Sequence, residues 1–304
     1  MSEGLPIHTS GLTKCFGDLT AVDALDLDVA SGEVFGFLGP NGAGKTTTIR
    51  VLLGLARATS GTAEVFGRDV WRESVEVHRR IGYVPGELSV WPSLRGREIL
   101  DLLGALHGSV DAARRDELCE RFDFDPTKRG RTYSRGNRQK IGLIAAFATN
   151  ADLLLLDEPT TGLDPLMEVT FRQLVGEVRS QGRTVFLSSH ILSEVESVCD
   201  RVGILRQGRL VEVGTLDDLR GMTVHTVEVR FAGAPPDLTG VDGVEKVEVS
   251  ANSVRFHLRG RPNALLAELS RHDVIDFESR EPSLEEVFLA YYGDGDHADD
   301  RGAN

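Results

Sequence analysis

A glycine-rich run near the amino end has the residue types and spacing of a phosphate-binding loop. It reads Gly39-Pro40-Asn41-Gly42-Ala43-Gly44-Lys45-Thr46 and fits the pattern G-x-x-x-x-G-K-T. Backbone N–H groups in such a loop face inward and, with the positive end of a helix dipole, form a cradle for phosphate oxygens. Lys45 would contact the β- and γ-phosphates, the Thr46 hydroxyl would bind Mg²⁺, and Thr47 belongs to the same expected nucleotide-binding set.

Two adjacent carboxylates form a second candidate for chemistry. Asp157 and Glu158 follow the apolar residues 153–156, a pattern typical of a parallel strand buried on both faces. Carboxylates at the end of a buried strand must be paired, hydrated or close to a metal ion. Because the same chain carries a phosphate loop, Mg²⁺ is the simplest such metal.

Four further residues each allow a functional and a structural interpretation. Phe16 could stack on a nucleobase or pack in a core. Ser134 opens an apolar helix at an anion site or merely caps it. Asp164 before Pro165 is a good helix start whatever else it does. His190 follows the predicted strand at 185–187 and two serines, and open α/β sheets place ligands beyond strand ends, although a lone histidine is more often structural.

Composition limits the class of protein. The chain has 304 residues, enough for one large domain and a small one, with 40% hydrophobic residues and a net charge of -13. The acidic balance argues against nucleic acid as a partner. No apolar run is long enough to span a bilayer, and the first residues lack the features of a signal peptide. The spacing of Cys15, Cys119 and Cys199 matches neither a disulfide framework nor a zinc site, which indicates a reducing cytosol.

The remaining pattern predicts the elements that position these residues. Residues 5–36 alternate in short runs and predict a β-rich entry region. A strand is expected before the phosphate loop and a helix after it. Residues 94–121 are expected to be helical, with Leu100, Leu103 and Leu106 on one stripe. Residues 202–212 predict a hairpin that turns at Gln207-Gly208.

Beyond residue 222 the pattern predicts a separate small domain. Val227, Val229 and Phe231 alternate with charged residues, and residues 254–259 show the same alternation. This pattern indicates strands with one buried and one solvent-exposed face. A helix is expected at 264–272, and a last helix is expected to open at Ser283. We expect domain boundaries of 5–220 and 223–292, and an acidic, disordered tail at 293–304.

Taken together, these motifs resemble the ATPase subunit of an ABC transporter over residues 5–220. The phosphate loop is similar to Walker A, residues 133–139 to the LSGGQ signature, and residues 153–158 to Walker B with its catalytic glutamate. Gly162-Leu163-Asp164 is similar to the D-loop, His190 to the switch histidine, and Phe16 to the aromatic residue that stacks on adenine. The resemblance implies an α/β fold, a P-loop NTPase cassette with a RecA-like core, a β-rich entry region and a helical subdomain at about 88–148, followed by a small α+β domain.

The resemblance also implies a division of roles. Lys45, Thr46 and the loop backbone would hold ATP and Mg²⁺, and Asp157 would help to hold the metal. Glu158 would polarise the attacking water, and His190 would sense the γ-phosphate. Ser134 and Gly136 would close over ATP bound to a second cassette. The expected partners are therefore that second cassette, most simply in a homodimer, and a separate transmembrane permease subunit, at the cytoplasmic face of the membrane.

Two departures from the family pattern affect these expectations. Arg135 and Asn137 replace the usual Gly and Gln of the signature, a form that resembles bacterial ABC-2 exporters of drugs and antibiotics. At the Q-loop, where the family often has Gln, this chain has Gly86-Glu87. Glu87 would then take over a metal or water contact, or the site would work without it.

Other functions compete with an exporter. Within transport, the alternatives are an importer or a lipid or polysaccharide transporter. Outside transport, a soluble ABC protein of ribosomes or DNA would usually carry two cassettes or long coiled coils, which this sequence lacks. A P-loop regulator that uses nucleotide only as a switch would not need the intact Asp157-Glu158 pair. We find no Asn-Lys-x-Asp guanine-reading motif, so ATP is favoured over GTP.

Overall fold

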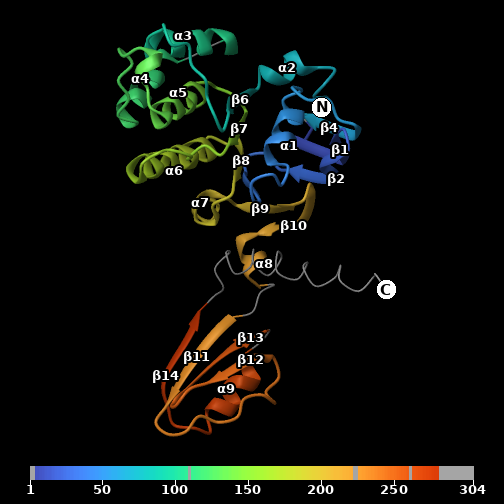
Figure 1. Cartoon of the computed structure of the whole chain (residues 1–304), viewed down its shortest axis with the longest axis vertical. Coiled ribbons are helices and arrows are strands. Elements are labelled where there is room, and N and C mark those ends of the chain that lie inside the picture. The colour runs from blue at the N-terminus through green and yellow to red at the C-terminus, as the bar shows by residue number, and fades with distance from the viewer. Residues whose placement is uncertain (1–3, 109–110, 222–224, 260–261, 281–304) are drawn as a thin grey trace. The chain divides into compact units, whose positions relative to one another are not determined.

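The computed structural model describes residues 4–108, 111–221, 225–259 and 262–280. These residues divide into two compact units, one that ends at Val213 and one that begins at Gly214. Figure 1 labels most of the helices and strands of both units. Each unit is described by itself.

The larger unit is built on a six-stranded sheet. Its strands run in the order β10-β9-β3-β8-β7-β6. Every residue of β3, β7 and β8 is buried, which explains the continuous apolar runs in the sequence. The bounds of the strands are Val34–Leu38 for β3, Ile81–Val84 for β6, Leu153–Asp157 for β7, Thr184–Ser189 for β8, Arg201–Arg206 for β9 and Arg209–Thr215 for β10.

Five of these strands, from β9 to β6, pair in parallel. The carboxyl ends of parallel strands meet at one edge of a sheet, and loops from that edge can share a site. Four parts of the expected site leave the strands at this edge. They are segments 39–46, 86–87 and 157–158, and residue His190. β9 and β10 form the predicted hairpin, and Gln207 and Gly208 take positive φ at its turn.

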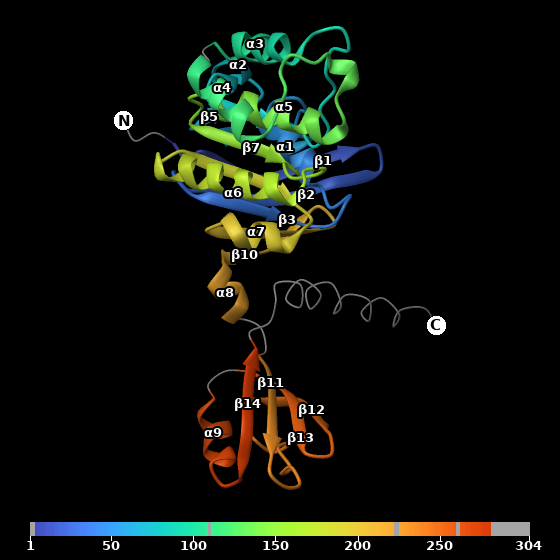
Figure 2. The same cartoon turned by 90° about the vertical axis from the view of Figure 1, so that its left-hand side faces the viewer.

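The predicted β-rich entry region is a second, antiparallel sheet in the order β2-β1-β4-β5. One hydrophobic core joins this sheet to helix α1 and to the inner strands of the first sheet, through residues such as Leu25, Ile49 and Phe186. Figure 2 shows α1 beside β1 and β2 in this unit. The bounds are Ile7–Phe16 for β1, Leu19–Val29 for β2, Ser60–Val65 for β4, Arg68–Asp69 for β5 and Lys45–Leu52 for α1.

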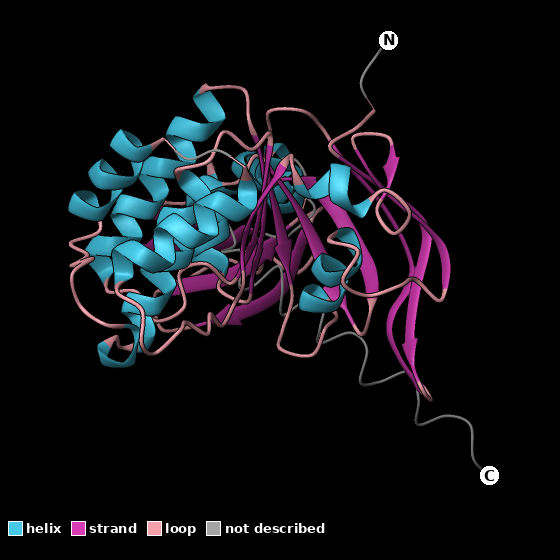
Figure 3. Cartoon of the chain, turned by 90° about the horizontal axis from the view of Figure 1, so that it is seen from above, coloured by secondary structure: helices cyan, strands magenta, loops and turns pink. Residues whose placement is uncertain are grey.

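Helices make up the other part of the larger unit (Figure 3). The stretch predicted as one helix at 94–121 is two helices, α3 and α4. Gly108 ends α3 with a φ of 97°, and Asp111 caps α4 through its side chain. Leu106 is 74% exposed, so the predicted leucine stripe is wrong at that position. The bounds are Ser74–His78 for α2, Gly96–His107 for α3, Ala112–Arg121 for α4, Gly130–Thr132 for the 3₁₀ helix η1, Arg135–Phe147 for α5, Pro165–Ser180 for α6 and Leu192–Val198 for α7.

The smaller unit is an antiparallel sheet with a helix. Its strands lie in the order β12-β13-β11-β14. The predicted alternation is confirmed, since Val227, Val229 and Phe256 are fully buried and pack with Leu265 of α9. The helix expected to open at Ser283 and the tail at 293–304 lie outside the described residues. The bounds are Leu216–Gly221 for α8, His225–Phe231 for β11, Val244–Val249 for β12, Ser253–Leu258 for β13, Asn263–Leu269 for α9 and Val274–Arg280 for β14.

Within the described residues, no helix combines the length and the apolar character that crossing a membrane requires.

Candidate functional site

The predicted strand, glycine loop and helix are all present around residues 39–46. Gly44 is the N-cap residue of α1 and has a φ of 110°. A Cβ atom at this position would lie 2.3 Å from the carbonyl oxygen of Ala21. Both facts exclude a larger residue there, because the left-handed backbone and the close contact each favour glycine. The loop therefore has the conformation that brings α1 and its N–H groups to the sheet edge.

The Lys45 side chain is buried at the centre of the loop. Its exposed fraction is 4%. The ammonium Nζ donates hydrogen bonds to the carbonyl oxygens of Gly39, at 2.7 Å, and Pro40, at 3.1 Å. Burial lowers the pKa of Lys45, and the nearby carboxylate of Glu158 partly opposes this shift. A buried cation of this kind is stabilised by added negative charge, which is what a phosphate group supplies.

The end of β7 is held to β8 by one serine. The Ser188 hydroxyl donates to Asp157 Oδ1 at 2.6 Å and accepts from the backbone N–H of Glu158 at 3.1 Å. The same N–H also donates to the Ser188 carbonyl at 3.1 Å. Sequence analysis missed Ser188. A signal was present, because it is a polar residue at the end of a buried strand that neighbours the end of β7.

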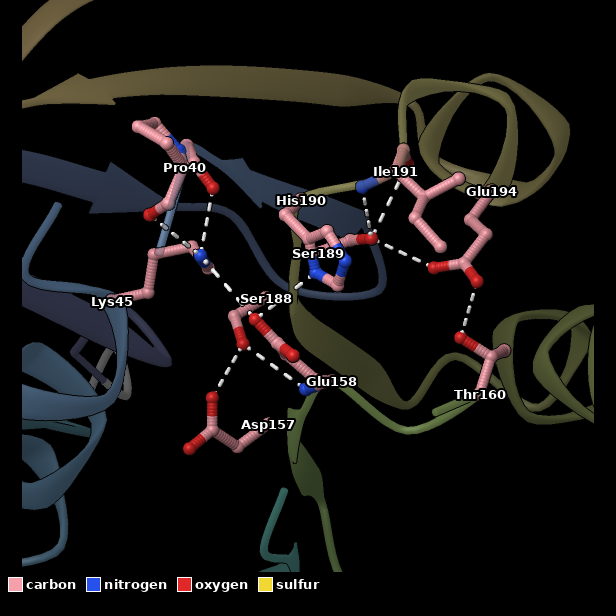
Figure 4. A network of polar contacts seen from close by, with 11 residues as sticks. Pro40, Lys45, Asp157, Glu158, Thr160, Ser188, Ser189, His190, Ile191 and Glu194 are labelled. Atoms are coloured by element: carbon pink, nitrogen blue, oxygen red, sulfur yellow. Dashed lines mark hydrogen bonds and ion pairs between the residues drawn. The ribbon is translucent and has the colours of Figure 1, made fainter. Parts of the chain in front are cut away.

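Glu158 lies between a lysine and a histidine. Its Oε1 atom is 3.4 Å from Lys45 Nζ and 3.2 Å from His190 Nδ1 (Figure 4). Its backbone takes a φ of 47°, which is uncommon for a residue other than glycine. Residues in strained conformations persist only where their surroundings hold them, and they cluster at functional sites. Here the strained backbone turns the carboxylate toward the phosphate loop.

Two adjoining pockets surround these groups. The first is lined by Phe16, Leu19, Ala21, six residues of the loop and helix start, and Glu158. Phe16 is 52% exposed, so it is not a core aromatic. The ammonium of Lys14 lies 4.7 Å from the centre of its ring. The residues of the loop and helix start in this pocket are Asn41, Gly42, Gly44, Lys45, Thr46 and Thr47.

The second pocket brings Glu87 to the carboxylates at the end of β7. Thr46, Glu87 and Asp157 all line it, together with Arg50 and Tyr83. Burial and the charge of Asp157 raise the pKa of Tyr83 to about 12. Among the described residues, no group of three His, Cys, Asp or Glu side chains could hold a metal ion alone. Thr46 and Asp157 supply the hard oxygen ligands that suit Mg²⁺, which takes its remaining ligands from water and substrate phosphates.

The signature-like residues line a different pocket. Ser134, Gly136 and Asp164 lie in it, whereas Lys45 and Glu158 do not. Ser134 caps α5 by accepting a hydrogen bond from the Asn137 N–H at 3.2 Å. Within one chain the structure therefore does not bring the signature to the phosphate loop.

Asp164 also has the capping role that the sequence allowed. Its Oδ1 atom accepts from the backbone N–H groups of Leu166 and Met167, each at 3.1 Å. A Cβ atom at Gly136 would lie 2.4 Å from the Gly162 carbonyl oxygen, so the signature helix and the D-loop-like turn are in close contact. The buried Gln139 side chain also ties α5 to this region by donating to the Pro159 carbonyl at 3.1 Å.

Two family models match the chain. The model described as ABC transporter matches residues 22–161, and the model described as ATP-binding protein DrrA1-3-like, C-terminal domain, matches residues 214–292. The daunorubicin resistance ATP-binding protein DrrA3 of Streptomyces coeruleorubidus is 39% identical over 304 residues, which cover 95% of this chain and 96% of that protein. The chain belongs to the ATP-binding subunits of ABC transporters. It is therefore an ABC-type ATPase that binds ATP, as the resemblance predicted.

A second relative and two solved structures are also similar to this chain. The bacitracin transport ATP-binding protein BcrA of Bacillus licheniformis is 35% identical over 300 residues, 95% of this chain and 98% of that protein. A solved ATP binding subunit of an ABC transporter has a TM-score of 0.66 and 29% identity, and it covers 71% of this chain and 92% of its own. A dimeric cassette bound to ADP and Pi has a TM-score of 0.63 at 21% identity over 69% of this chain and 98% of its own, which shows the shared fold.

Proposed function

We propose that this chain hydrolyses ATP to drive export of a drug-like or antibiotic-like small molecule through a separate membrane subunit. The observation that carries this proposal is the extent of the similarity. Relatives named for daunorubicin resistance and bacitracin transport match 95% of the chain, and the second unit matches the DrrA1-3-like C-terminal model. An importer would share the cassette, but the match of the second unit to the DrrA1-3-like C-terminal model favours an exporter. The ATPase would work at the cytoplasmic face of the membrane, where its permease partner presents a docking site.

The geometry supports a division of labour at the phosphate loop. The loop N–H groups and Lys45 bind the phosphates of ATP, and Phe16 offers an exposed ring at the edge of the same pocket for the adenine. Thr46 and Asp157, with Glu87 beside them, would hold Mg²⁺. When bound, Mg²⁺ supplies positive charge that offsets the charge of the phosphate oxygens.

Glu158 is the proposed general base. Its carboxylate takes a proton from the water whose oxygen attacks the γ-phosphorus, while the bond from that phosphorus to the leaving ADP oxygen breaks. In the chain alone, Lys45 and His190 both contact this carboxylate. A γ-phosphate would compete for Lys45 and His190, so nucleotide binding would release the carboxylate to act on water.

A second copy of the chain completes the site in this proposal. Ser134, Gly136 and Asp164 line a pocket that shares no residue with the two pockets at the phosphate loop. Two cassettes arranged head to tail would place the signature of each against the nucleotide of the other. ATP would then hold the pair together, and its hydrolysis would let the pair separate.

Co-purification from detergent-solubilised membranes tests the proposed function. We expect the chain to bring with it an integral membrane protein. Inside-out vesicles that contain both proteins should accumulate the exported drug-like or antibiotic-like molecule only with ATP. Recovery of the chain with ribosomes, with no membrane protein, would contradict the proposal.

Two tryptophan variants test how ATP hydrolysis is coupled to transport. Trp91 is 45% exposed on the loop that follows β6, and it forms with Pro92 and Leu94 the apolar surface proposed to contact the membrane subunit. Trp71 is 48% exposed elsewhere in the same unit and serves as the matched control. Trp91→Ala should lose transport and keep basal ATP hydrolysis, whereas Trp71→Ala should keep both. Equal transport by the two variants would rule out this docking surface.

A further inference from the structure

A glutamate outside the roles described above joins two segments of the proposed active site. Glu194 lies in the first turn of α7, directly after the histidine loop. Its Oε1 atom accepts a hydrogen bond from the Thr160 hydroxyl at 2.5 Å, and its Oε2 atom accepts one from the Ser189 hydroxyl at 2.7 Å (Figure 4). Thr160 comes two residues after Glu158, and Ser189 directly precedes His190. One carboxylate therefore holds both of the segments that carry these side chains.

The protons in this network are assigned by its donors and acceptors. The Ser189 oxygen accepts from the Ile191 backbone N–H at 2.9 Å, and its own proton has two acceptors, Glu194 Oε2 at 2.7 Å and the Ile191 carbonyl oxygen at 3.2 Å. Thr160 and Ser189 have exposed fractions of 6% and 1%. Buried hydroxyls that lose their acceptor cost free energy, and hydrogen bonds to a charged group are stronger than neutral ones. The carboxylate is thus an acceptor that both buried hydroxyls share, and for Ser189 it is the nearer of two acceptors.

The hydrogen bonds to Glu194 support the strained backbone of Glu158. On its amino side, the backbone N–H of Glu158 is held by Ser188. On its carboxyl side, the chain turns through a hydrogen bond from Thr161 N–H to the Glu158 carbonyl at 3.2 Å, and Thr160 within that turn is tied to Glu194. A φ of 47° at Glu158 needs support from both sides, because the left-handed conformation is disfavoured for a side chain of this kind. Glu194 provides the support on the carboxyl side.

We infer that Glu194 is a positioning residue for ATP hydrolysis. It holds the backbone of Glu158 and the loop of His190 in fixed positions relative to each other. This inference rests on the proposed roles of Glu158 and His190. Glu194 touches neither of these two side chains in the contacts of the described residues, so it acts through Thr160 and Ser189. A small displacement of a catalytic group lowers the rate of the chemical step, whereas the phosphate loop that binds ATP is unchanged.

Steady-state kinetics separate positioning from a structural role. Glu194→Ala should lower kcat about 10- to 100-fold and change the KM for ATP by no more than about twofold. Glu194→Gln should recover part of the loss, because its amide can accept from one hydroxyl and donate to the other once that hydroxyl rotates. Glu120→Ala, an exposed glutamate on α4, is the control and should keep the kcat of the unchanged protein. A lower melting temperature with an unchanged kcat would show a structural role only and would overturn the inference.

A double-mutant cycle tests the route of the effect. Thr160→Val keeps the shape of the side chain and removes the hydroxyl. If Glu194 acts through Thr160, Thr160→Val should lower kcat in the parent protein and add little to the loss in Glu194→Ala. Full additivity of the two losses would contradict the inference. Thr160→Val also serves as the test if Glu194→Ala does not fold.

Hydrogen exchange gives an answer that does not depend on catalysis. In Glu194→Ala, the amides of Glu158, Thr160 and Thr161 should exchange faster, while those of β7 at 153–156 keep their protection. If the parent protein does not hydrolyse ATP, the proposed function fails, but local loss of protection would still support the link. If the parent hydrolyses ATP, and Glu194→Ala matches it in both kcat and exchange, the link fails and the proposed function stands.

Discussion

The contact between Gly136 and the Gly162 carbonyl predicts the effect of adding one methyl group. A Cβ atom at residue 136 would lie 2.4 Å from that oxygen, and ordinary contact begins near 3.4 Å. The signature helix and the turn at Gly162 would therefore have to move apart by about 1 Å in Gly136→Ala. Overpacking of this kind costs about 1–3 kcal/mol. The same change favours the helix by about 1 kcal/mol, because alanine has a higher helix propensity than glycine.

The two effects partly cancel in stability but not in activity. We expect Gly136→Ala to destabilise the protein by about 0–2 kcal/mol, which lowers Tm by no more than about 8 °C. ATP hydrolysis should fall about 10- to 100-fold, because Ser134 and Asp164 are displaced relative to each other. Thermal melting and a phosphate-release assay on the same preparations measure both quantities.

Gly142→Ala is the matched control, because it changes the same helix in the same way. A Cβ atom at residue 142 would make ordinary contacts of 3.4 Å with Val84 and 3.5 Å with Leu88. Tm should stay constant or rise by about 2–4 °C, and hydrolysis should be unchanged. If the two variants behave alike in both assays, the close contact at Gly162 has no role in the active site.

Two further predictions concern the pockets at the phosphate loop. Phe16→Ala should weaken ATP binding by about 1–3 kcal/mol while Phe16→Tyr keeps most of it, measured by equilibrium titration; equal affinities would exclude stacking. Tyr83 should stay neutral in the folded protein up to a pH near its pKa of about 12, whereas it ionises near pH 10 in the unfolded chain. Folded stability should therefore fall as pH rises from about 10 to 12, and Tyr83→Phe should show a shallower fall in alkaline denaturation; identical profiles would contradict this assignment.

The sequence alone predicted the parts of the site that depend on local pattern. The glycine loop, the buried strand before Asp157 and the cap at Asp164 are each specified by neighbouring residue types, and the structure confirms these local elements. The family resemblance, which the comparisons confirm, supplied the ATPase function. The roles of the individual site residues come from the family resemblance and remain predictions.

Features that depend on contacts between distant segments could not be predicted. Glu194 gains its partners only when α7 comes together with the end of β8 and the turn after β7. The positive φ of Glu158 likewise has no signal in a glutamate followed by a proline. The break between α3 and α4, by contrast, had a local signal in the sequence. Gly108 and Asp111 are ordinary helix stop and start signals, and the apolar periodicity obscured them.

Association of the Glu158→Gln variant with ATP tests the account most directly. With ATP and Mg²⁺ the variant should sediment as a dimer that retains ATP, because it binds nucleotide but hydrolyses it about 10²–10⁴ times more slowly than the unchanged protein. With ADP it should sediment as a monomer. A variant that stays monomeric with ATP, with or without its membrane subunit, or that hydrolyses ATP at the rate of the unchanged protein, would contradict the account.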